Sequence, residues 1–168
     1  MENEFEEKSM EYVDGEMQLS KYLKVKDFTF SQTAVNNKID NRLPLNRLED
    51  AKKIAAVYDR IYEQFKGKVK LNSGYRSPAL NKRVGGSPNS QHPLAQAIDV
   101  DGINGVKNSQ ILSWVMRNVR YNQLIQEYGT VTEPAWVHIG FGTKMQFLKI
   151  GVKGTKALMD ALGDDVDI

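Results

Sequence analysis

The chain contains two histidines, His92 and His138, and no cysteine. A metal site would therefore use imidazole, carboxylate or backbone groups, because thiolate ligands are absent from the sequence. Asp99 follows His92 by seven residues. Together the three side chains match the two imidazoles and one carboxylate that hold many catalytic zinc ions, with a fourth position left for water.

Two short strands would have to position these side chains. His92 lies in a loop just before residues 96–102, a short predicted strand that carries Asp99. His138 lies within a second strand-like run, residues 135–141. Pairing of the strands would bring the three side chains to one face, where rigid strands hold ligands in place.

Each of these residues also fits an ordinary structural role when it is taken alone. A histidine in a strand is commonly a half-buried residue rather than a ligand, and an aspartate before a turn commonly serves the turn. Asp101 shares a strand face with Asp99, but DVDG is ordinary turn chemistry and is too short for a calcium loop. We leave Asp101 out of the expected metal set.

The remaining sequence alternates between helical and strand-like patterns. Apolar residues at three- and four-residue steps predict a helix over 45–66, and Gly67 provides its C-terminal stop. Ser77 and Pro78 are suited to begin a second, short helix. The pattern predicts an α+β fold with a small, mainly antiparallel sheet flanked by helices. The other expected elements are strands at 68–76, 122–129 and 145–150 and helices at 77–86, 108–119 and 154–162. The strand at 122–129 is expected to pair with 135–141 as a hairpin.

Charge divides the chain into three parts. Residues 1–18 carry seven acids and one lysine, residues 160–168 carry four aspartates and no base, and residues 19–159 carry 22 bases against 10 acids. We expect a flexible acidic arm over 1–18, one domain over 19–159 and an acidic tail. A basic domain attracts nucleic acid, anionic polymers or acidic peptides, although a solvated basic surface explains the same charge.

The beginning of the chain predicts its compartment. It is acidic and has no apolar core, so we expect no secretory signal, and synthesis in the cytoplasm. No later run approaches the roughly 18 apolar residues of a membrane span. We therefore expect no membrane-spanning segment.

Three motifs resemble those of the zinc peptidases that act on bacterial cell walls. This is the D-alanyl-D-alanine carboxypeptidase and L-alanyl-D-glutamate endopeptidase family, which includes many phage endolysins and shares its fold with the amino-terminal domain of hedgehog proteins. The resemblance covers roughly residues 20–145. Its motifs are Ser-Gly-Tyr-Arg, Ser-x-His-x-x-Gly-x-Ala-x-Asp and Trp-x-His, which fall on Arg76, Ser90, His92, Ala97, Asp99, Trp136 and His138.

The resemblance implies a hedgehog/DD-peptidase-like fold and a metal centre. It implies one Zn²⁺ per chain, held by His92, Asp99 and His138. The usual glycine three residues after the first histidine is Ala95 in this chain, which a slightly different loop can absorb.

The resemblance also implies residues that contact the substrate. Arg76 is expected to bind a carbonyl or carboxylate group of the peptide and to orient it for catalysis, a task that suits a guanidinium fork. Ser90 and Tyr75 are further candidates for substrate contacts. The alternatives are that Arg76 ties down its own turn, that Ser90 steadies the loop, and that Tyr75 belongs to the core.

The general base is the main departure from the family pattern. Related enzymes often carry it three residues before the second histidine, but that position is Ala135 here. Glu127 ends the strand expected to pair with 135–141, and shorter family members carry a Glu-aromatic-Gly segment before Trp-Val-His. Glu133 is nearer in sequence but lies in the hairpin connection, where a solvated carboxylate is expected. We predict that Glu127 is the base.

The expected function is zinc-dependent hydrolysis of amide bonds in peptidoglycan stem or cross-bridge peptides. The protein would be a phage or prophage lysin, made in the host cytoplasm and acting at the bacterial cell wall during lysis or as a virion component. Its acidic arm is a candidate for binding a virion partner, and no nucleic acid partner is expected. The main alternative is a zinc-stabilised binding or virion structural module without catalysis. A nucleic-acid-binding protein is a second alternative, and it predicts salt-dependent binding that survives metal removal.

Overall fold

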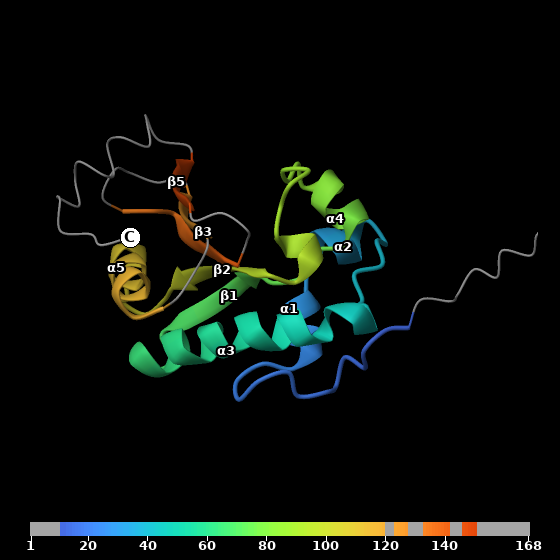
Figure 1. Cartoon of the computed structure of the whole chain (residues 1–168), viewed down its shortest axis with the longest axis horizontal. Coiled ribbons are helices and arrows are strands. Elements are labelled where there is room, and N and C mark those ends of the chain that lie inside the picture. The colour runs from blue at the N-terminus through green and yellow to red at the C-terminus, as the bar shows by residue number, and fades with distance from the viewer. Residues whose placement is uncertain (1–10, 120–122, 128–132, 142–145, 151–168) are drawn as a thin grey trace, which may run out of the picture.

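A single five-stranded sheet with helices packed around it organises the described part of the chain (Figure 1). The computed structural model describes residues 11–119, 123–127, 133–141 and 146–150, and for 123–127 and 146–150 it describes the backbone alone. In chain order the elements are α1 (Val25–Thr29), α2 (Gln32–Asn36), the 3-10 helix η1 (Leu45–Arg47), α3 (Leu48–Gln64), β1 (Val69–Ser73), α4 (Pro78–Arg83), the 3-10 helix η2 (His92–Leu94), β2 (Ala97–Gly102), α5 (Asn108–Asn118), β3 (Gln123–Glu127), β4 (Trp136–Gly140) and β5 (Gln146–Ile150).

The strands are ordered β1-β2-β4-β3-β5 across the sheet. The first four pair antiparallel, and β5 pairs parallel to β3. The β1–β2 register shifts between Leu71 and Ser73, so that Ser73 lies opposite Asp99. The predicted α+β class, the mainly antiparallel sheet and the β3–β4 hairpin are confirmed, whereas the parallel β5 was not predicted.

The helix α3 packs against the sheet at β1 and β2. Its buried residues recur at helical spacing, which is the pattern that predicted a helix over 45–66. Glu49 and Asp50 lie in its first turn, where the helix dipole favours negative charge. Gly67 follows the helix with φ of +76°, which is favourable for glycine. The buried residues of α3 are Ala51, Ile54, Ala55, Val57, Tyr58 and Ile61.

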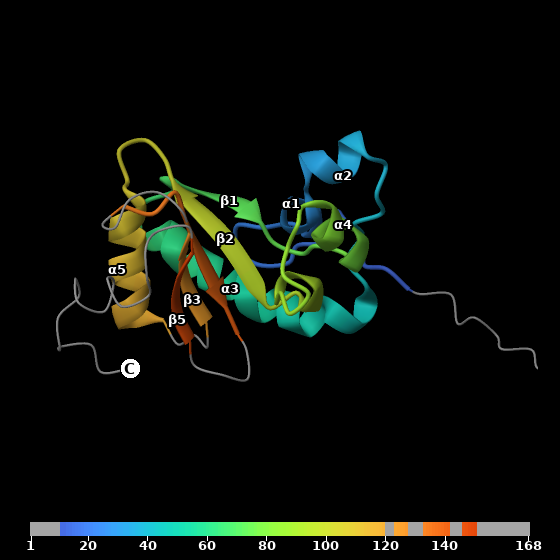
Figure 2. The ribbon, with the colours of Figure 1, turned by 90° about the horizontal axis from the view of Figure 1, so that it is seen from above.

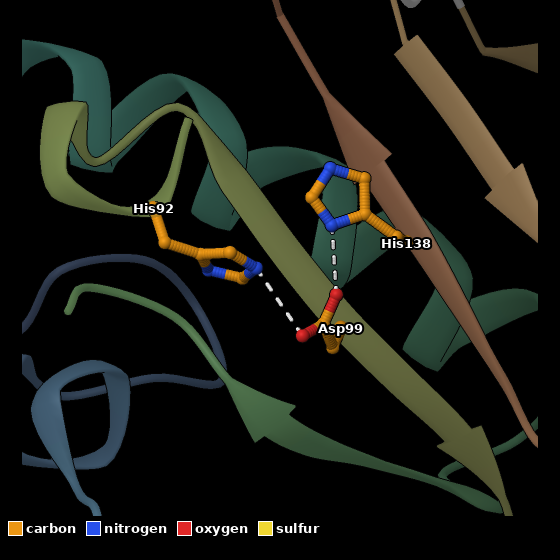
Figure 3. A group of neighbouring side chains, drawn as sticks. All are labelled: His92, Asp99 and His138. Carbon is orange, nitrogen blue, oxygen red and sulfur yellow. Dashed lines mark hydrogen bonds and ion pairs between the residues drawn. The ribbon is translucent and has the colours of Figure 1, made fainter. Parts of the chain in front are cut away.

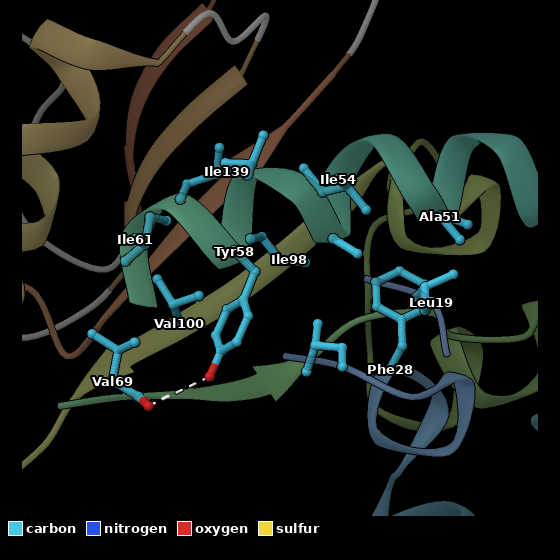
Figure 4. Packing of buried hydrophobic residues seen from close by; sticks show 14 of the residues in the cluster. Leu19, Phe28, Ala51, Ile54, Tyr58, Ile61, Val69, Ile98, Val100 and Ile139 are labelled. Atoms are coloured by element: carbon cyan, nitrogen blue, oxygen red, sulfur yellow. Dashed lines mark hydrogen bonds between the residues drawn. The ribbon is translucent and has the colours of Figure 1, made fainter. Parts of the chain in front are cut away.

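The hydrophobic core lies between one face of the sheet and the helices α3 and α5 (Figure 4). Alternate residues of β2 and β4 point into it and are fully buried. The buried side chain of Tyr58 donates a hydrogen bond from its hydroxyl to the Val69 carbonyl oxygen at 3.4 Å. Burial raises the pKa of Tyr58 to about 12. The strand residues in the core are Ile98, Val100, Val137 and Ile139.

The short helices α1, α2 and α4 gather at the end of the molecule away from α5 (Figures 1 and 2). Ser77 caps α4 by accepting the Leu80 amide at 3.2 Å, and Pro78 opens the helix as the sequence predicts. The helices α1 and α2 were not predicted. Phe28 of α1 anchors this end, because its side chain is fully buried in the core.

Part of the expected acidic arm contacts the domain. The amide of Val13 donates to the Leu43 carbonyl at 2.9 Å, and the amide of Leu45 donates to the Glu11 carbonyl at the same distance. The guanidinium of Arg42 lies 3.8 Å from the ring centroid of Tyr12. Residues 1–10, 160–168 and the helix expected at 154–162 lie outside the described residues. We propose that the domain extends back at least to residue 11.

None of the helices that the structure describes is both long enough and apolar enough to cross a membrane. The longest, α3, has 17 residues and carries a polar face.

Candidate metal centre

Strand pairing places Asp99 and His138 side by side. In the antiparallel register of β2 and β4 the two residues lie directly opposite each other. Their neighbours Ile98 and Ile139 point into the core, so alternation sends Asp99 and His138 to the other face of the sheet. The local sequence therefore builds a polar pair on a strand pair whose opposite face is apolar.

His92 reaches the same point from η2, which precedes β2. Its amide donates to the Ser90 hydroxyl at 3.3 Å, which steadies the turn. Its Nδ1 lies 2.7 Å from the carbonyl oxygen of Gly74. Because a carbonyl oxygen only accepts, Nδ1 carries the proton and Nε2 of the neutral ring presents a lone pair.

The three side chains form the His–Asp–His cluster, defined as His92, Asp99 and His138 (Figure 3). His92 Nε2 lies 3.2 Å from Asp99 Oδ2, and His138 Nδ1 lies 2.9 Å from Asp99 Oδ1. One ligand atom from each residue lies within 4.8 Å of the others. The residues are 1%, 9% and 5% exposed, respectively, so the donor atoms are shielded from bulk water.

Burial and mutual contacts set the protonation states of His92 and Asp99. Burial lowers the pKa of His92 below its ordinary value, and the opposing attraction of Asp99 does not offset it. Burial alone would raise the pKa of Asp99, but the adjacent His92 and His138 outweigh it and hold that pKa well below its ordinary value. An ionised carboxylate beside a neutral imidazole is the state that metal binding requires.

The donor set fits a zinc ion. His92 Nε2 is buried and has no hydrogen-bond partner among the described residues. Its lone pair faces a carboxylate oxygen, an arrangement of two acceptors that a cation between them would stabilise. Two imidazole nitrogens and a carboxylate are the ligand types of many catalytic zinc sites.

Arg76 lies beside the His–Asp–His cluster in the turn after β1. Its Nη2 is 3.8 Å from Asp99 Oδ2, and its Nη1 donates to Asn81 Oδ1 at 3.2 Å. Gly86 permits this contact, because a Cβ there would lie 2.1 Å from Asn81 Oδ1. The guanidinium is therefore held close to the candidate metal ligands.

Asn41 secures the backbone on both sides of Arg76. Its Nδ2 donates to the carbonyl oxygens of Tyr75, at 3.1 Å, and Thr29, at 2.7 Å. Its Oδ1 accepts the amide of Ser77 at 2.7 Å. Asn41 is buried, so the turn carrying Arg76 is fixed by a polar group that has its partners satisfied.

The other candidates for substrate contacts lie in different environments. Tyr75 is only 4% exposed and belongs to the core cluster, so it offers a ligand little surface. Ser90 is partly exposed and accepts the His92 amide, which fits the alternative that it steadies the loop. The substrate-binding roles of both residues stay predictions.

The two candidate bases differ in what the structure describes. Glu127 pairs with Trp136 in the β3–β4 register, and its side chain lies outside the described part. Glu133 Oε1 accepts the amide of Ser109 at 3.3 Å, in the first turn of α5. Glu133 therefore has a structural role, because its carboxylate accepts a free amide at the start of α5.

Asp101 has structural partners within the described residues. Asn108 Nδ2 donates to Asp101 Oδ1 at 2.7 Å, and Lys70 Nζ lies 3.9 Å from its other oxygen. Asn108 also donates to the Ala135 carbonyl at 2.7 Å, joining the start of α5 to the segment that precedes β4. Both oxygens of Asp101 therefore contact groups that hold neighbouring elements together.

Three buried amides near the site were missed by sequence reasoning. Asn41 and Asn81 hold the surroundings of Arg76, and Gln91 joins η2 to the end of β4 by donating to Phe141. Asparagine and glutamine are common in loops and short helices, so their positions in the sequence do not indicate these contacts. The one available signal was the position of Gln91 directly before His92.

A sequence comparison covers this whole region. A family model described as Peptidase M15 matches residues 21–140, more than half of the chain. The matched range contains the His–Asp–His cluster and Arg76. No curated protein matches the chain.

Proposed function

The chain belongs to the Peptidase M15 family, and from that premise we propose that it hydrolyses amide bonds in peptidoglycan stem or cross-bridge peptides with one zinc ion. The observation that carries this proposal is the convergence of the His–Asp–His cluster, in which the buried His92 Nε2 has no hydrogen-bond partner within the described part of the chain and lies 3.2 Å from Asp99 Oδ2. The proposed zinc ligands are His92 Nε2, His138 Nδ1 and the Asp99 carboxylate.

The residues around the cluster divide the chemical work. Zinc bound there would supply a Lewis acid that polarises the scissile carbonyl and lowers the pKa of water. Arg76 donates hydrogen bonds to a carbonyl or carboxylate of the peptide and fixes its orientation. Its contacts with Asn81 and Asp99 support this role, because they limit the freedom of the guanidinium before substrate binds.

We assign the general base to Glu127. Ile125 lies opposite His138 in the β3–β4 register, so position 127 is two residues along the strand, on the same face as position 138. The contact of Glu133 with the Ser109 amide further favours Glu127. In this role Glu127 takes a proton from the attacking water and delivers it to the leaving amine.

The biological setting is part of the same proposal. We propose a phage or prophage lysin acting at the bacterial cell wall, with the acidic arm as a site for a virion partner. The excess of bases over acids in residues 19–159 supports it, because a basic surface is attracted to anionic wall polymers. Whether the enzyme acts as a carboxypeptidase or an endopeptidase follows from which peptide ends it releases.

The test is cleavage of purified peptidoglycan by zinc-loaded protein, with mass analysis of the products. Glu127→Gln is expected to lower kcat about 100- to 10,000-fold while zinc affinity is retained, because the amide keeps the shape but cannot accept the proton. Glu133→Gln is the matched control and should keep most of the activity. Loss of activity in Glu133→Gln alone would move the assignment to that residue.

Absence of new amine ends with wild-type protein would overturn the peptidase proposal. If such a protein still binds one zinc ion and gains thermal stability from it, the zinc-stabilised binding module becomes the better reading. Binding of DNA or RNA that survives chelation and weakens steeply with salt would instead support the nucleic-acid alternative.

A further inference from the structure

Gln91 joins the two segments that carry the histidines of the cluster. It precedes His92 in the chain and is 9% exposed. Its Nε2 donates to the Phe141 carbonyl oxygen at 2.5 Å, just beyond the end of β4, the strand that carries His138. Because a carbonyl oxygen only accepts, this bond fixes which end of the amide is nitrogen and turns Oε1 away from Phe141.

The Oε1 atom of Gln91 is a buried acceptor near the ring of His138. It has no hydrogen-bond partner among the described residues. A Cβ built on Gly140 would lie 1.8 Å from this atom and 3.3 Å from His138 Nε2, so the two atoms are within about 5 Å of each other. A closing movement of at most about 2 Å would bring them to ordinary hydrogen-bond distance.

Metal binding changes what the ring of His138 requires. Its Nδ1 lies 2.9 Å from Asp99 Oδ1, where a protonated Nδ1 donates to the carboxylate. To bind a metal, Nδ1 must instead present its lone pair, and a neutral imidazole then carries its proton on Nε2. An acceptor for Nε2–H therefore favours the tautomer that binds metal, as outer partners of metal-bound histidines generally do.

We propose that Gln91 is a positioning residue for the metal centre. Its Oε1 accepts the Nε2–H of His138 and stabilises the tautomer whose Nδ1 is a metal ligand. The proposal rests on the zinc centre proposed above, and it adds a residue that acts through His138 without touching metal or substrate. Gly140 is part of the arrangement, because a side chain at that position would displace Oε1.

Two substitutions of similar length separate the acceptor from the bond to Phe141. Gln91→Met removes both hydrogen-bonding functions, whereas Gln91→Glu loses the donor to Phe141 and keeps an acceptor. We expect the zinc Kd to rise about 10- to 100-fold in Gln91→Met and to stay within about threefold of wild type in Gln91→Glu. A purely structural role through Phe141 predicts equal losses in both variants, and that result would overturn the proposal.

Zinc affinity is measured by competition with a chelator of known affinity, using metal-free protein whose fold is verified by circular dichroism. Gln96→Met is the matched control, because the Gln96 side chain bonds to Asp50 at 3.4 Å and lies on the same loop. It should leave the zinc Kd unchanged. Gly140→Ala provides a second route to the same test and should weaken zinc binding by displacing Gln91 Oε1.

Nitrogen NMR of the zinc-loaded protein gives a readout independent of activity. We expect His138 to be protonated at Nε2, with a proton that exchanges slowly in wild type and faster in Gln91→Met. Wild-type zinc affinity in both Gln91→Met and Gly140→Ala would overturn the inference while leaving the zinc centre intact. A wild-type protein that binds no zinc would overturn both, whereas the expected affinity pattern without peptide cleavage would remove only the peptidase function.

Discussion

Adjacent residues of β2 lie in opposite environments. Asp99 faces the two imidazoles of the His–Asp–His cluster, whereas Ile98 and Val100 are fully buried among aliphatic side chains (Figures 3 and 4). The strand β4 repeats the pattern, with His138 on the site face and Ile139 on the core face. In this strand pair, neighbouring residues therefore belong alternately to the candidate metal centre and to the hydrophobic core.

The difference concerns what each face contributes to folding. Burial of apolar side chains on the core face stabilises the fold by roughly 1.5–3 kcal/mol for each large residue. On the site face, the cost of desolvating a carboxylate and two imidazoles offsets the gain from their mutual contacts. We infer that the site face serves binding, and that burial on the core face provides the stability that offsets the desolvation cost of the site face.

The largest expected effect is the loss of zinc affinity in Asp99→Asn. Replacing an outer partner of a metal ligand costs 10- to 100-fold, so loss of a direct carboxylate ligand should cost about 1000-fold, or about 4 kcal/mol. The amide retains hydrogen-bonding capacity toward the histidines, so the unfolding free energy of metal-free protein should change by less than about 1 kcal/mol. Chelator competition and denaturant unfolding measure the two quantities. Global unfolding of Asp99→Asn would contradict the inference that the site face contributes little to stability.

The neighbouring substitution, Ile98→Ala, should have the reverse profile. It removes a fully buried side chain from the core, which costs about 3 kcal/mol of unfolding free energy, within the 2–5 kcal/mol typical of such changes. The folded fraction should still bind zinc with an affinity near that of wild type. Denaturant unfolding with the slope held constant measures the first effect. A stability loss below about 1 kcal/mol would show that the core face is less important than its burial indicates.

The parts of the fold that could be predicted are those with a local signal. The long helix α3 follows from apolar spacing, and the start of α4 follows from Ser77 and Pro78. The helices α1 and α2 are five residues each, which is too short for periodicity to register. The parallel pairing of β5 with β3 joins segments whose order in the sheet no local pattern encodes.

The same distinction holds for the site. The residue types and the strands carrying Asp99 and His138 could be predicted from the sequence, because metal chemistry limits the choice of ligand and the chain has few histidines. The Gly74 carbonyl that orients His92 could not be read, since any residue has a carbonyl. The bond from Gln91 to Phe141, 50 residues away, could not be predicted either, because it forms only once β4 has paired with β2.

Asn41 sharpens the comparison, because it is a polar residue near the site that should contribute to stability. Asn41→Ala leaves the buried groups that it joins without their partner, among them the Ser77 amide, and should cost about 2 kcal/mol. Loosening of the turn should also raise KM for peptide, since Arg76 lies between Tyr75 and Ser77. Denaturant unfolding and amide exchange at Ser77 test this. Asn36→Ala, at an exposed position, is the control and should change stability little.

The smallest expected effect is that of Ala95→Gly, which restores the glycine of the family pattern. Ala95 has φ of +56° and ψ of +33°, a left-handed conformation that costs an L-residue about 1–2 kcal/mol, yet its methyl group is fully buried. Ala95→Gly relieves the strain but loses about 0.8 kcal/mol of burial and about 0.5–1 kcal/mol through the greater freedom of unfolded glycine. These contributions nearly cancel, so denaturant unfolding should show a change below about 1 kcal/mol.

Ala95→Val tests the same balance from the other side. A β-branched residue is disfavoured in the left-handed region, and a buried site offers the added methyl groups no space. We expect a loss of more than about 2 kcal/mol by denaturant unfolding. If Ala95→Gly instead stabilised the protein by that amount, the backbone strain at Ala95 would outweigh the burial of its methyl group. The loop that presents His92 would then be maintained at a net conformational cost.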